Sequence, residues 1–413
     1  MRILFLHQSF QSLKDGGSGR GNDFARRLSE RRHAVTCLAG TFNYLTATVP
    51  PEFKGRLSVR ERLDGYEVVR AWTYEGYHKS FGHRVLTLLS FMLTSIVVGI
   101  REQRPDVIAP CTPPFFLGIT GYVLSLWHRA PMVYEVRDLW SEVAFQLGIV
   151  KNRWVIWAVR RLERFLYSRS RYVVINSPGF IEPLQAMGVP PSRIRLIPNG
   201  VDLEQFRPIP EARDRVRSEN RWEGKFVVMY AGSIGMANGL SLMLDAAELM
   251  RDESEILFVL VGDGQQRAEL ESSARARQLE NVQFLGAVPK QRIPELLAGA
   301  DAGVATLLDI PLFRTTYPNK VFDYMACGRP TIIAIDGVIR DVIDKSRGGL
   351  FVPPQDSRAL ADGVRWLRDN PQEANAMGLR ALTYVRKHFD RRNAEILMAD
   401  LMDELNASLK SSR

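Results

Sequence analysis

Short apolar runs alternate with amphipathic stretches along the first half of the chain. The apolar runs have the length of buried strands and end in glycine, proline or polar residues, and residues 24–33 show helical periodicity. Strands that alternate with helices indicate a parallel, doubly wound sheet. The predicted strands of this half are residues 2–7, 34–40, 106–110, 132–138 and 172–178.

The same alternation restarts after a proline-rich segment, residues 198–214, which we interpret as a linker. We therefore expect an α/β protein with two facing Rossmann-like doubly wound domains, over residues 1–205 and 206–390, and a further helix from residue 391. The predicted strands of the second domain are 225–232, 256–264, 282–288, 302–307 and 330–335, and its predicted helices are 240–250, 268–278, 293–300 and 321–328.

Composition restricts the class of protein and its partners. The 413 residues are 46% hydrophobic and 24% charged, as in globular proteins, and three scattered cysteines argue against a disulfide framework or a cysteine zinc site. No secretory signal is visible at the start of the chain, so we expect a cytoplasmic protein. Residues 1–205 hold 27 Lys and Arg against 17 Asp and Glu, whereas the remainder holds 28 against 29. The first half should therefore favour an anionic partner, either nucleic acid or a membrane.

Two apolar stretches help to choose between these partners. Residues 85–100 carry no charge but are shorter than the roughly 20 apolar residues of a spanning helix. Residues 153–171 place apolar side chains at helical spacing between arginines. Each stretch has the pattern of a core helix or of a membrane-surface helix, and their joint presence in the basic half favours an anionic membrane over nucleic acid. The apolar stripe is Trp154, Trp157, Ala158, Leu162 and Phe165, flanked by Arg153, Arg160, Arg161 and Arg164.

A glycine-rich loop follows the first predicted strand. Gly16 and Gly17 lie in it before a helix, where exposed backbone N–H groups bind phosphate. The spacing differs from the dinucleotide G-x-G-x-x-G pattern, and no acidic residue closes the next strand, which disfavours an NAD site. The loop has two interpretations, a flexible surface loop or a phosphate-binding loop.

Three segments at the carboxyl ends of strands in the second domain outline a diphosphate site. Gly232 and Ser233 follow one strand and Gly262 and Asp263 follow another, and each pair alone is compatible with a simple tight turn. The third segment, 313–323, begins a helix whose positive end would face the same rim.

Arg314 and Lys320 add full positive charges to this third segment. Asp323 is suited to accept hydrogen bonds from sugar hydroxyls, or alternatively only favours the helix start electrostatically. Metal chemistry is not indicated, because the sequence has no H-x-x-x-H pair and no Asp-x-Asp at a strand end.

Four segments, 173–206, 260–264, 321–332 and 348–364, resemble in that order the family 4 retaining glycosyltransferases of the GT-B fold. The resemblance runs from the glycine loop to about residue 390. Residues 134–140 (YEVRDLW), 230–240 (YAGSIGMANGL) and 316–328 (TYPNKVFDYMACG) are similar to the bacterial O-antigen and capsule branch that includes N-acetyl-L-fucosamine transferases. The resemblance implies a metal-independent, retaining, hexosyltransferase-type enzyme without a cofactor, whose donor is a nucleoside-diphosphate sugar, usually UDP-linked. It also implies that the helix from residue 391 crosses back to the first domain.

Several positions depart from the family pattern. The family's glutamate pair falls on Thr315 and Asp323, its phosphate-binding lysine on Asn238, and its first-domain histidine on Arg137, which Asp138 follows. A neutral residue at 315 implies that the donor sugar is recognised differently. Because position 238 lacks the lysine, other cations would have to neutralise the diphosphate. The donor-binding residues implied in the third segment are Thr315, Thr316, Tyr317, Pro318, Asn319 and Asp323.

These observations predict transfer of a sugar to a glycan acceptor, with an undecaprenyl-diphosphate-linked glycan as the candidate, in bacterial surface polysaccharide biosynthesis. We expect Lys320 and Arg314 to stabilise the leaving diphosphate, and Arg137 and Asp138 to orient the acceptor or the sugar. The basic first half predicts a peripheral location on the inner face of the cell membrane. Two alternatives remain open at this point: a nucleotide-sugar epimerase of the same fold, and a non-catalytic subunit that binds a nucleotide sugar.

Overall fold

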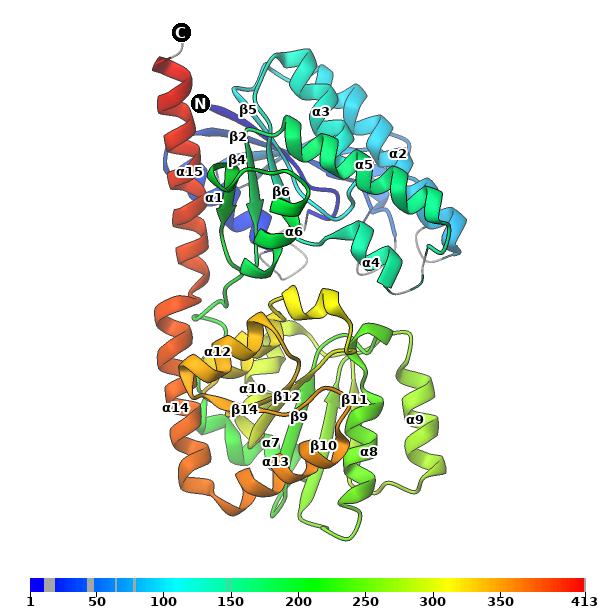
Figure 1. The fold of residues 1–413 in the computed structure, drawn as a ribbon, viewed down its shortest axis with the longest axis vertical. Helices are drawn as coiled ribbons and strands as arrows, with labels where there is room; N and C mark the ends of the chain where they lie inside the picture. The colour runs from blue at the N-terminus through cyan, green and yellow to red at the C-terminus, as the bar shows by residue number, and fades with distance from the viewer. Residues whose placement is uncertain are drawn as a thin grey trace. The chain divides into compact units, whose positions relative to one another are not determined.

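The computed structural model describes residues 1–10, 19–42, 48–63, 65–76, 79–146, 148 and 150–411. It divides into two compact units (Figure 1). Unit 1 is Met1–Ile197 together with Ala394–Arg413, and unit 2 is Pro198–Asn393. The chain passes from one unit to the other at 197/198 and at 393/394. The sequence analysis placed these boundaries at 205/206 and 390/391.

Unit 1 contains a parallel sheet with one antiparallel edge. Its order is β3-β4-β2-β1-β5, and isolated bridges from Ile108 to Met132 and from Cys111 to Glu135 connect it to a second sheet of order β6-β7-β8. The predicted strands of this half are confirmed, but the antiparallel pair β3–β4 was not predicted. The strands are β1 (Arg2–Leu6), β2 (Ala34–Gly40), β3 (Ser58–Leu63), β4 (Tyr66–Ala71), β5 (Val107–Pro110), β6 (Val133–Val136), β7 (Tyr172–Ile175) and β8 (Ile194–Leu196).

Helices cover both faces of this sheet, so β1 is apolar on both sides. Ile3 and Phe5 pack on the face covered by α1 and α15, and Leu4 and Leu6 pack on the face covered by α2 and α3, because successive side chains of a strand point to opposite faces. The helices are α1 (Arg20–Glu30), α2 (Phe81–Ile100), α3 (Leu117–His128), α4 (Trp140–Gln146), α5 (Arg153–Arg169), α6 (Ile181–Ala186) and α15 (Arg391–Ser411).

Unit 2 is built on a six-stranded sheet in which all pairs are parallel, of order β11-β10-β9-β12-β13-β14. The predicted strands and helices of this half are confirmed. The strands are β9 (Phe226–Ala231), β10 (Ile256–Val261), β11 (Val282–Gly286), β12 (Ala302–Thr306), β13 (Thr331–Ala334) and β14 (Gly349–Phe351). The helices are α7 (Arg213–Asn220), α8 (Ser241–Leu249), α9 (Arg267–Ala276), α10 (Ile293–Gly299), α11 (Asn319–Ala326), α12 (Val338–Ser346), α13 (Ser357–Asp369) and α14 (Pro371–His388).

The order of strands reverses between β9 and β12. From β9 the chain adds strands on one side, and from β12 it adds them on the other, so the loops that follow these two neighbours diverge. In parallel α/β sheets this point leaves a crevice at the carboxyl ends of the strands, where ligands bind. The topology of unit 2 therefore indicates where its functional residues should be sought.

The return of α15 to unit 1 predicts a local difference in stability. Met398 is 1% exposed and belongs to the core that holds β1 and α1, whereas its neighbour Leu397 is 43% exposed. We expect Met398→Ala to lower the free energy of unfolding of unit 1 by about 2–5 kcal/mol, because it leaves a cavity. Leu397→Ala should change it by less than about 0.5 kcal/mol. Urea unfolding measures both, and equal effects would contradict the packing of α15.

Candidate active site

Two glycine turns meet where β9 and β10 end. The N–H of Gly232 donates to the carbonyl of Val261 at 2.9 Å, and the N–H of Ile234 donates to the carbonyl of Asp263, also at 2.9 Å. A Cβ atom at Gly262 would lie 1.8 Å from the carbonyl oxygen of Gly232, and the φ of Gly262 is +141°. Only glycine tolerates this approach and this backbone conformation. The two turns predicted to share one rim of the sheet are therefore in direct backbone contact.

Lys320 lies beside these turns, in the first turn of α11. Its ammonium group donates hydrogen bonds to the Oη of Tyr230 and the Oδ1 of Asn238, each at 2.7 Å, and lies 4.2 Å from the centre of the Tyr230 ring. Tyr230 and Asn238 are in turn fixed by the carbonyl of Ser233, which accepts from the Tyr230 hydroxyl at 2.6 Å and from the Asn238 amide at 2.9 Å. The segment at the end of β9 and helix α11, which follows β12, thus hold the Lys320 ammonium at the carboxyl ends of the strands.

The partners of Lys320 are neutral, and this determines the electrostatics of the site. Among the described residues no carboxylate forms an ion pair with Lys320. Burial lowers the pKa of Lys320 to about 7, and burial raises the pKa of Tyr230, so the phenol stays neutral and supplies no counter-charge. An ammonium has three N–H donors, and two are used by these partners. A bound anion would restore the missing counter-charge and stabilise the protonated amine.

A pocket of about 350 Å³ opens beside the glycine turns. Asp323 lies in its wall, one turn along α11 from Lys320, and burial raises the pKa of this carboxyl to about 7. The positive charges of Lys290 and Arg391 act in the opposite direction, whereas Asp202 raises the pKa further. The wall is formed by Phe206, Ala231, Gly232, Ser233, Val261, Gly262, Asp263, Ala287, Val288, Lys290, Ile293, Asp323 and Tyr324. Apolar walls, glycine backbones, two acidic residues and Lys290 give a surface suited to a flat ring with hydroxyl substituents.

Arg314 is not brought to Lys320. Its guanidinium donates to Asp309 at 3.0 Å, its side chain is 52% exposed, and this hydrogen bond raises its pKa. It lies in a 3-10 helix, Pro311–Thr315, in which the hydroxyl of Thr315 donates to the carbonyl of Leu312 at 2.6 Å. Lys320 is therefore the predicted cation that the structure places at the strand ends, and the role of Arg314 stays a prediction.

The residues that lead into α11 shape its start. The Thr316 hydroxyl donates to the carbonyl of Phe313 at 3.1 Å, and the Tyr317 ring packs edge-on against Phe322 with 5.6 Å between centroids. Pro318 occupies the N-cap position, and Asn319 is the first helical residue and is exposed. Their proposed contacts to a donor stay predictions, but they orient the helix that carries Lys320 and Asp323.

Unit 1 has its own cluster of charged residues at the carboxyl ends of β1 and β6. Arg20 pairs with Glu135 at 2.7 Å and donates to the carbonyl of Ile197 at 2.6 Å. Burial acts to raise the pKa of Glu135, but Arg20 and Arg137 outweigh it and hold the pKa below its ordinary value. Burial, reinforced by Arg137, lowers the pKa of His7 to about 4. Two guanidinium groups face Glu135, and Asp138 beside Arg137 adds a second carboxyl.

The predicted residues of unit 1 are only partly described. Arg137 directly follows β6, its backbone N–H donates to the hydroxyl of Thr112 at 2.8 Å, and Asp138 beside it is exposed. Gly16 and Gly17 lie outside the described residues. Sequence reasoning missed Arg20, although its place at the first position of α1, after the glycine loop, marks it as a residue of the strand-end rim.

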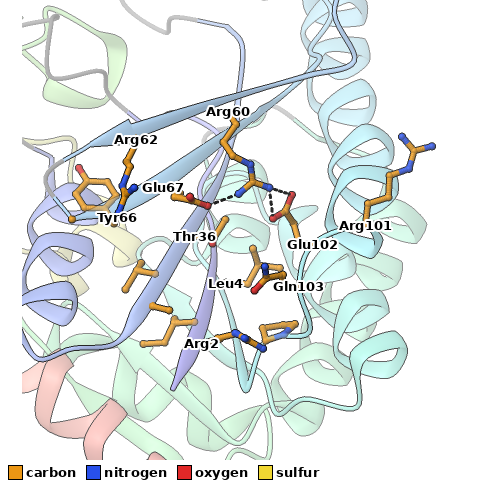
Figure 2. Close-up of a pocket in the computed structure, with 15 residues that line it drawn as sticks. Arg2, Leu4, Thr36, Arg60, Arg62, Tyr66, Glu67, Arg101, Glu102 and Gln103 are labelled. Atoms are coloured by element: carbon orange, nitrogen blue, oxygen red, sulfur yellow. Dashed lines mark hydrogen bonds and ion pairs between the residues drawn. The ribbon is translucent and has the colours of Figure 1, made fainter.

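A larger pocket, of about 530 Å³, lies elsewhere in unit 1 (Figure 2). It includes Arg2 and Ala34, the first residues of β1 and β2, so it is at the amino ends of the strands. Figure 2 shows Arg60 between Glu67 and Glu102, and it forms ion pairs with both. None of the predicted site residues lines this pocket, and its central arginine is already neutralised. The smaller pocket of unit 2 is the better candidate because predicted site residues line it and Lys320, which lacks a counter-charge, adjoins Gly232 in its wall.

Tyr230 and Lys290 are residues of the unit 2 site that sequence reasoning missed. Tyr230 contacts Lys320 directly. Tyr230 is the second-last residue of β9, and in the sequence it has the pattern of an ordinary core residue of a buried strand. Its position two residues before Gly232 was the available clue, because side chains at strand ends face the crevice. Among the residues that the structure describes, no group of three or more His, Cys, Asp or Glu side chains is placed to hold a metal ion.

Both parts of the chain match models of known families. Residues 16–200 match the family described as glycosyl transferase 4-like domain, and residues 225–370 match glycosyl transferases group 1. A probable glycosyltransferase, WbjE of Pseudomonas aeruginosa, is 25% identical over 272 residues, 65% of this chain and 68% of that protein. A putative colanic acid biosynthesis glycosyl transferase, WcaI of Escherichia coli K12, is 24% identical over 320 residues, 75% of this chain and 77% of the relative.

Solved structures with the same architecture extend over nearly the whole chain. HepE of Anabaena, solved in complex with UDP and glucose, superposes with a TM-score of 0.74 at 18% identity and covers 97% of this chain and 99% of its own. Sucrose-phosphate synthase of Thermosynechococcus elongatus superposes with a TM-score of 0.77 at 19% identity, over 98% of this chain and 99% of its own. The predicted GT-B fold, with two α/β domains, is confirmed.

The electrostatics of Lys320 predict an unusual titration. Its ammonium should lose its proton with a midpoint near pH 7, because burial removes the water that stabilises the charged form. NMR of protein with lysine isotope-labelled at Cε measures this, and the Lys320→Arg variant identifies the resonance. A midpoint at about 10.4, the value of a solvated lysine, would contradict the burial of the amine.

Proposed function

We propose that this chain, whose two parts match a glycosyl transferase 4-like domain and glycosyl transferases group 1, transfers a sugar from a UDP-linked donor to a glycan acceptor of a bacterial surface polysaccharide. The observation that carries the proposal is the uncompensated ammonium of Lys320 at the strand ends of unit 2. The UDP complex of the similar fold of HepE and the colanic acid relative WcaI support the choice of donor and of process.

Lys320 would hold the diphosphate of the donor. A diphosphate carries the negative charge that the site lacks, and the first N–H groups of α11 point the positive end of that helix in the same direction. Asn238 stands where the family's lysine was expected, and its side chain instead holds the Lys320 amine at 2.7 Å. We infer that Lys320 supplies the cation that position 238 lacks.

Asp323 would bind the ribose. Its carboxyl lies in the pocket wall, and among the described residues no group donates a hydrogen bond to it, so its oxygens remain available to hydroxyl donors. Gly232, Ser233 and Gly262 line the wall that the donor would contact, and the two glycines present only backbone there. A threonine at 315, whose hydroxyl is used inside its own 3-10 helix, makes a deoxy or amino sugar a suitable donor.

The reaction we propose keeps the anomeric configuration and uses no metal or protein nucleophile. The bond between the anomeric carbon and the phosphate oxygen breaks, the acceptor oxygen bonds to the same face of the carbon, and the departing phosphate oxygen takes the acceptor proton. Lys320 stabilises the charge that develops on this phosphate as the bond lengthens. Arg137 and Asp138 keep their proposed role of orienting the acceptor or the sugar.

A direct assay distinguishes this proposal from its two alternatives. The protein is incubated with a panel of UDP-sugars and undecaprenyl-diphosphate-linked glycans, and the products are identified by mass spectrometry. A glycan heavier by one sugar residue supports transfer. Conversion of the donor without any acceptor would instead identify an epimerase, and binding of UDP in a calorimetric titration without any product would identify a non-catalytic subunit.

The role of Lys320 predicts a specific loss of turnover. We expect Lys320→Ala to lower kcat about 10²–10³-fold at saturating donor, the usual cost of removing one group that stabilises developing negative charge. Lys345→Ala is the matched control, because Lys345 lies on α12 and is exposed. Steady-state kinetics with the best donor of the panel measures both variants. An unchanged kcat in Lys320→Ala would remove this residue from the reaction.

A further inference from the structure

Three helices of unit 1 form one layer on the sheet (Figure 1). The hydroxyls of Ser95 on α2 and Thr120 on α3 lie 3.3 Å apart, and the rings of Tyr122 on α3 and Phe165 on α5 meet edge-on at 4.9 Å. Helix α3 therefore lies between α2 and α5. The side of this layer away from the sheet, here called the outer face, is unusually apolar.

Helix α5 shows the exposed apolar side chains of the outer face most clearly. Its buried side is formed by Ile156, Leu166 and Tyr167, and Trp154, Trp157 and Ala158 of the predicted stripe are exposed on the opposite side. Trp154 is 79% exposed and Trp157 is 61% exposed. A stripe at helical spacing normally packs in a core, but here the core uses the other side of the helix.

The neighbouring helices continue this surface. Leu126 and Trp127 of α3 are each 62% exposed, and Leu93 and Val97 of α2 are also exposed. Helix α2 meets the length and composition of a membrane-spanning helix between Gly82 and Ile100, and 28% of that segment is buried. Phe91 anchors the other side of α2 in the core of unit 1, so its exposed leucine and valine belong to a folded surface.

The outer face is also cationic. Glu163 is the single acidic residue in the sequences of α2, α3 and α5, and it is buried, whereas α5 alone contains five arginines. Arg160 pairs with Glu142. The exposed Arg161 and Arg164 form no ion pair among the described residues, and their positions place them on the same side of α5 as Trp154 and Trp157.

We propose that the outer face docks unit 1 on an anionic bilayer. Tryptophan side chains partition into the interface between headgroups and acyl chains, and unpaired arginines gain from the negative surface potential. A second copy of the chain fits less well, because a symmetric contact would bring the same arginines against each other. The inference extends the proposed function by placing the enzyme where a lipid-linked acceptor resides, but docking itself requires no sugar transfer.

Flotation of the full-length protein with vesicles tests this surface. The vesicles contain phosphatidylcholine alone or an equal mixture with phosphatidylglycerol, at low and at high salt. We expect binding to the mixed vesicles at low salt. Arg161→Gln combined with Arg164→Gln should weaken it about thirtyfold, since each arginine near such a surface contributes on the order of a fivefold gain. Trp154→Ala combined with Trp157→Ala should weaken it more than about tenfold.

Matched controls lie on the surface of unit 2. Arg275→Gln with Arg358→Gln removes the same charge, and Trp366→Ala removes an exposed tryptophan, and neither change should affect binding. Thermal melting verifies that every variant folds, and calorimetric titration with UDP, which needs no vesicles, tests the donor site separately. Equal binding to neutral and anionic vesicles, or unchanged binding of the outer-face variants, would overturn the proposal. A dimer seen in gel filtration and lost in the tryptophan variant would assign the face to a second copy instead.

Discussion

A half-buried ammonium group without a carboxylate partner is the interaction on which the candidate site depends. Removing a charge from water is costly, and hydrogen bonds to neutral oxygens repay only part of that cost, so the pKa of Lys320 falls to about 7. Lysines that are removed from water in protein interiors are usually paired with an acidic residue. The tyrosine and asparagine that hold Lys320 keep the cation in place without neutralising it. The site is thereby prepared for an anion that arrives from outside.

The architecture of unit 2 explains why this cation lies where it does. The reversal of strand order between β9 and β12 opens a crevice, and the loops after β9 and β10 must pass so close that glycine is required at 262. Helix α11 follows β12 and begins at the same rim, so its first turn carries Lys320 over Tyr230. The fold thus determines where Lys320 lies, and its neutral partners leave its positive charge uncompensated.

Much of this could be predicted from the sequence, because buried parallel strands are continuous apolar runs and the turns after them carry glycine. The antiparallel pair β3–β4 was missed, and for β3 the reason is that half of its residues are exposed and its apolar content is low. Asn238 was noted only as a missing lysine, whereas its actual contact joins segments 82 residues apart and has no local pattern. Arg314 was predicted beside Lys320 from charge alone, and nearby Asp309 engages it instead. For the stripe on α5, periodicity shows that one side is apolar but not whether that side faces the core.

Comparing the affinities of UDP and uridine in wild-type protein and in Lys320→Ala tests the central claim most directly. Calorimetric titration near pH 7 isolates the contribution of the diphosphate, because uridine is the same nucleoside without it. We expect wild-type protein to bind UDP much more tightly than uridine and the substitution to remove most of that difference while leaving uridine binding unchanged. An unchanged ratio of the two affinities in Lys320→Ala would show that the diphosphate is held elsewhere.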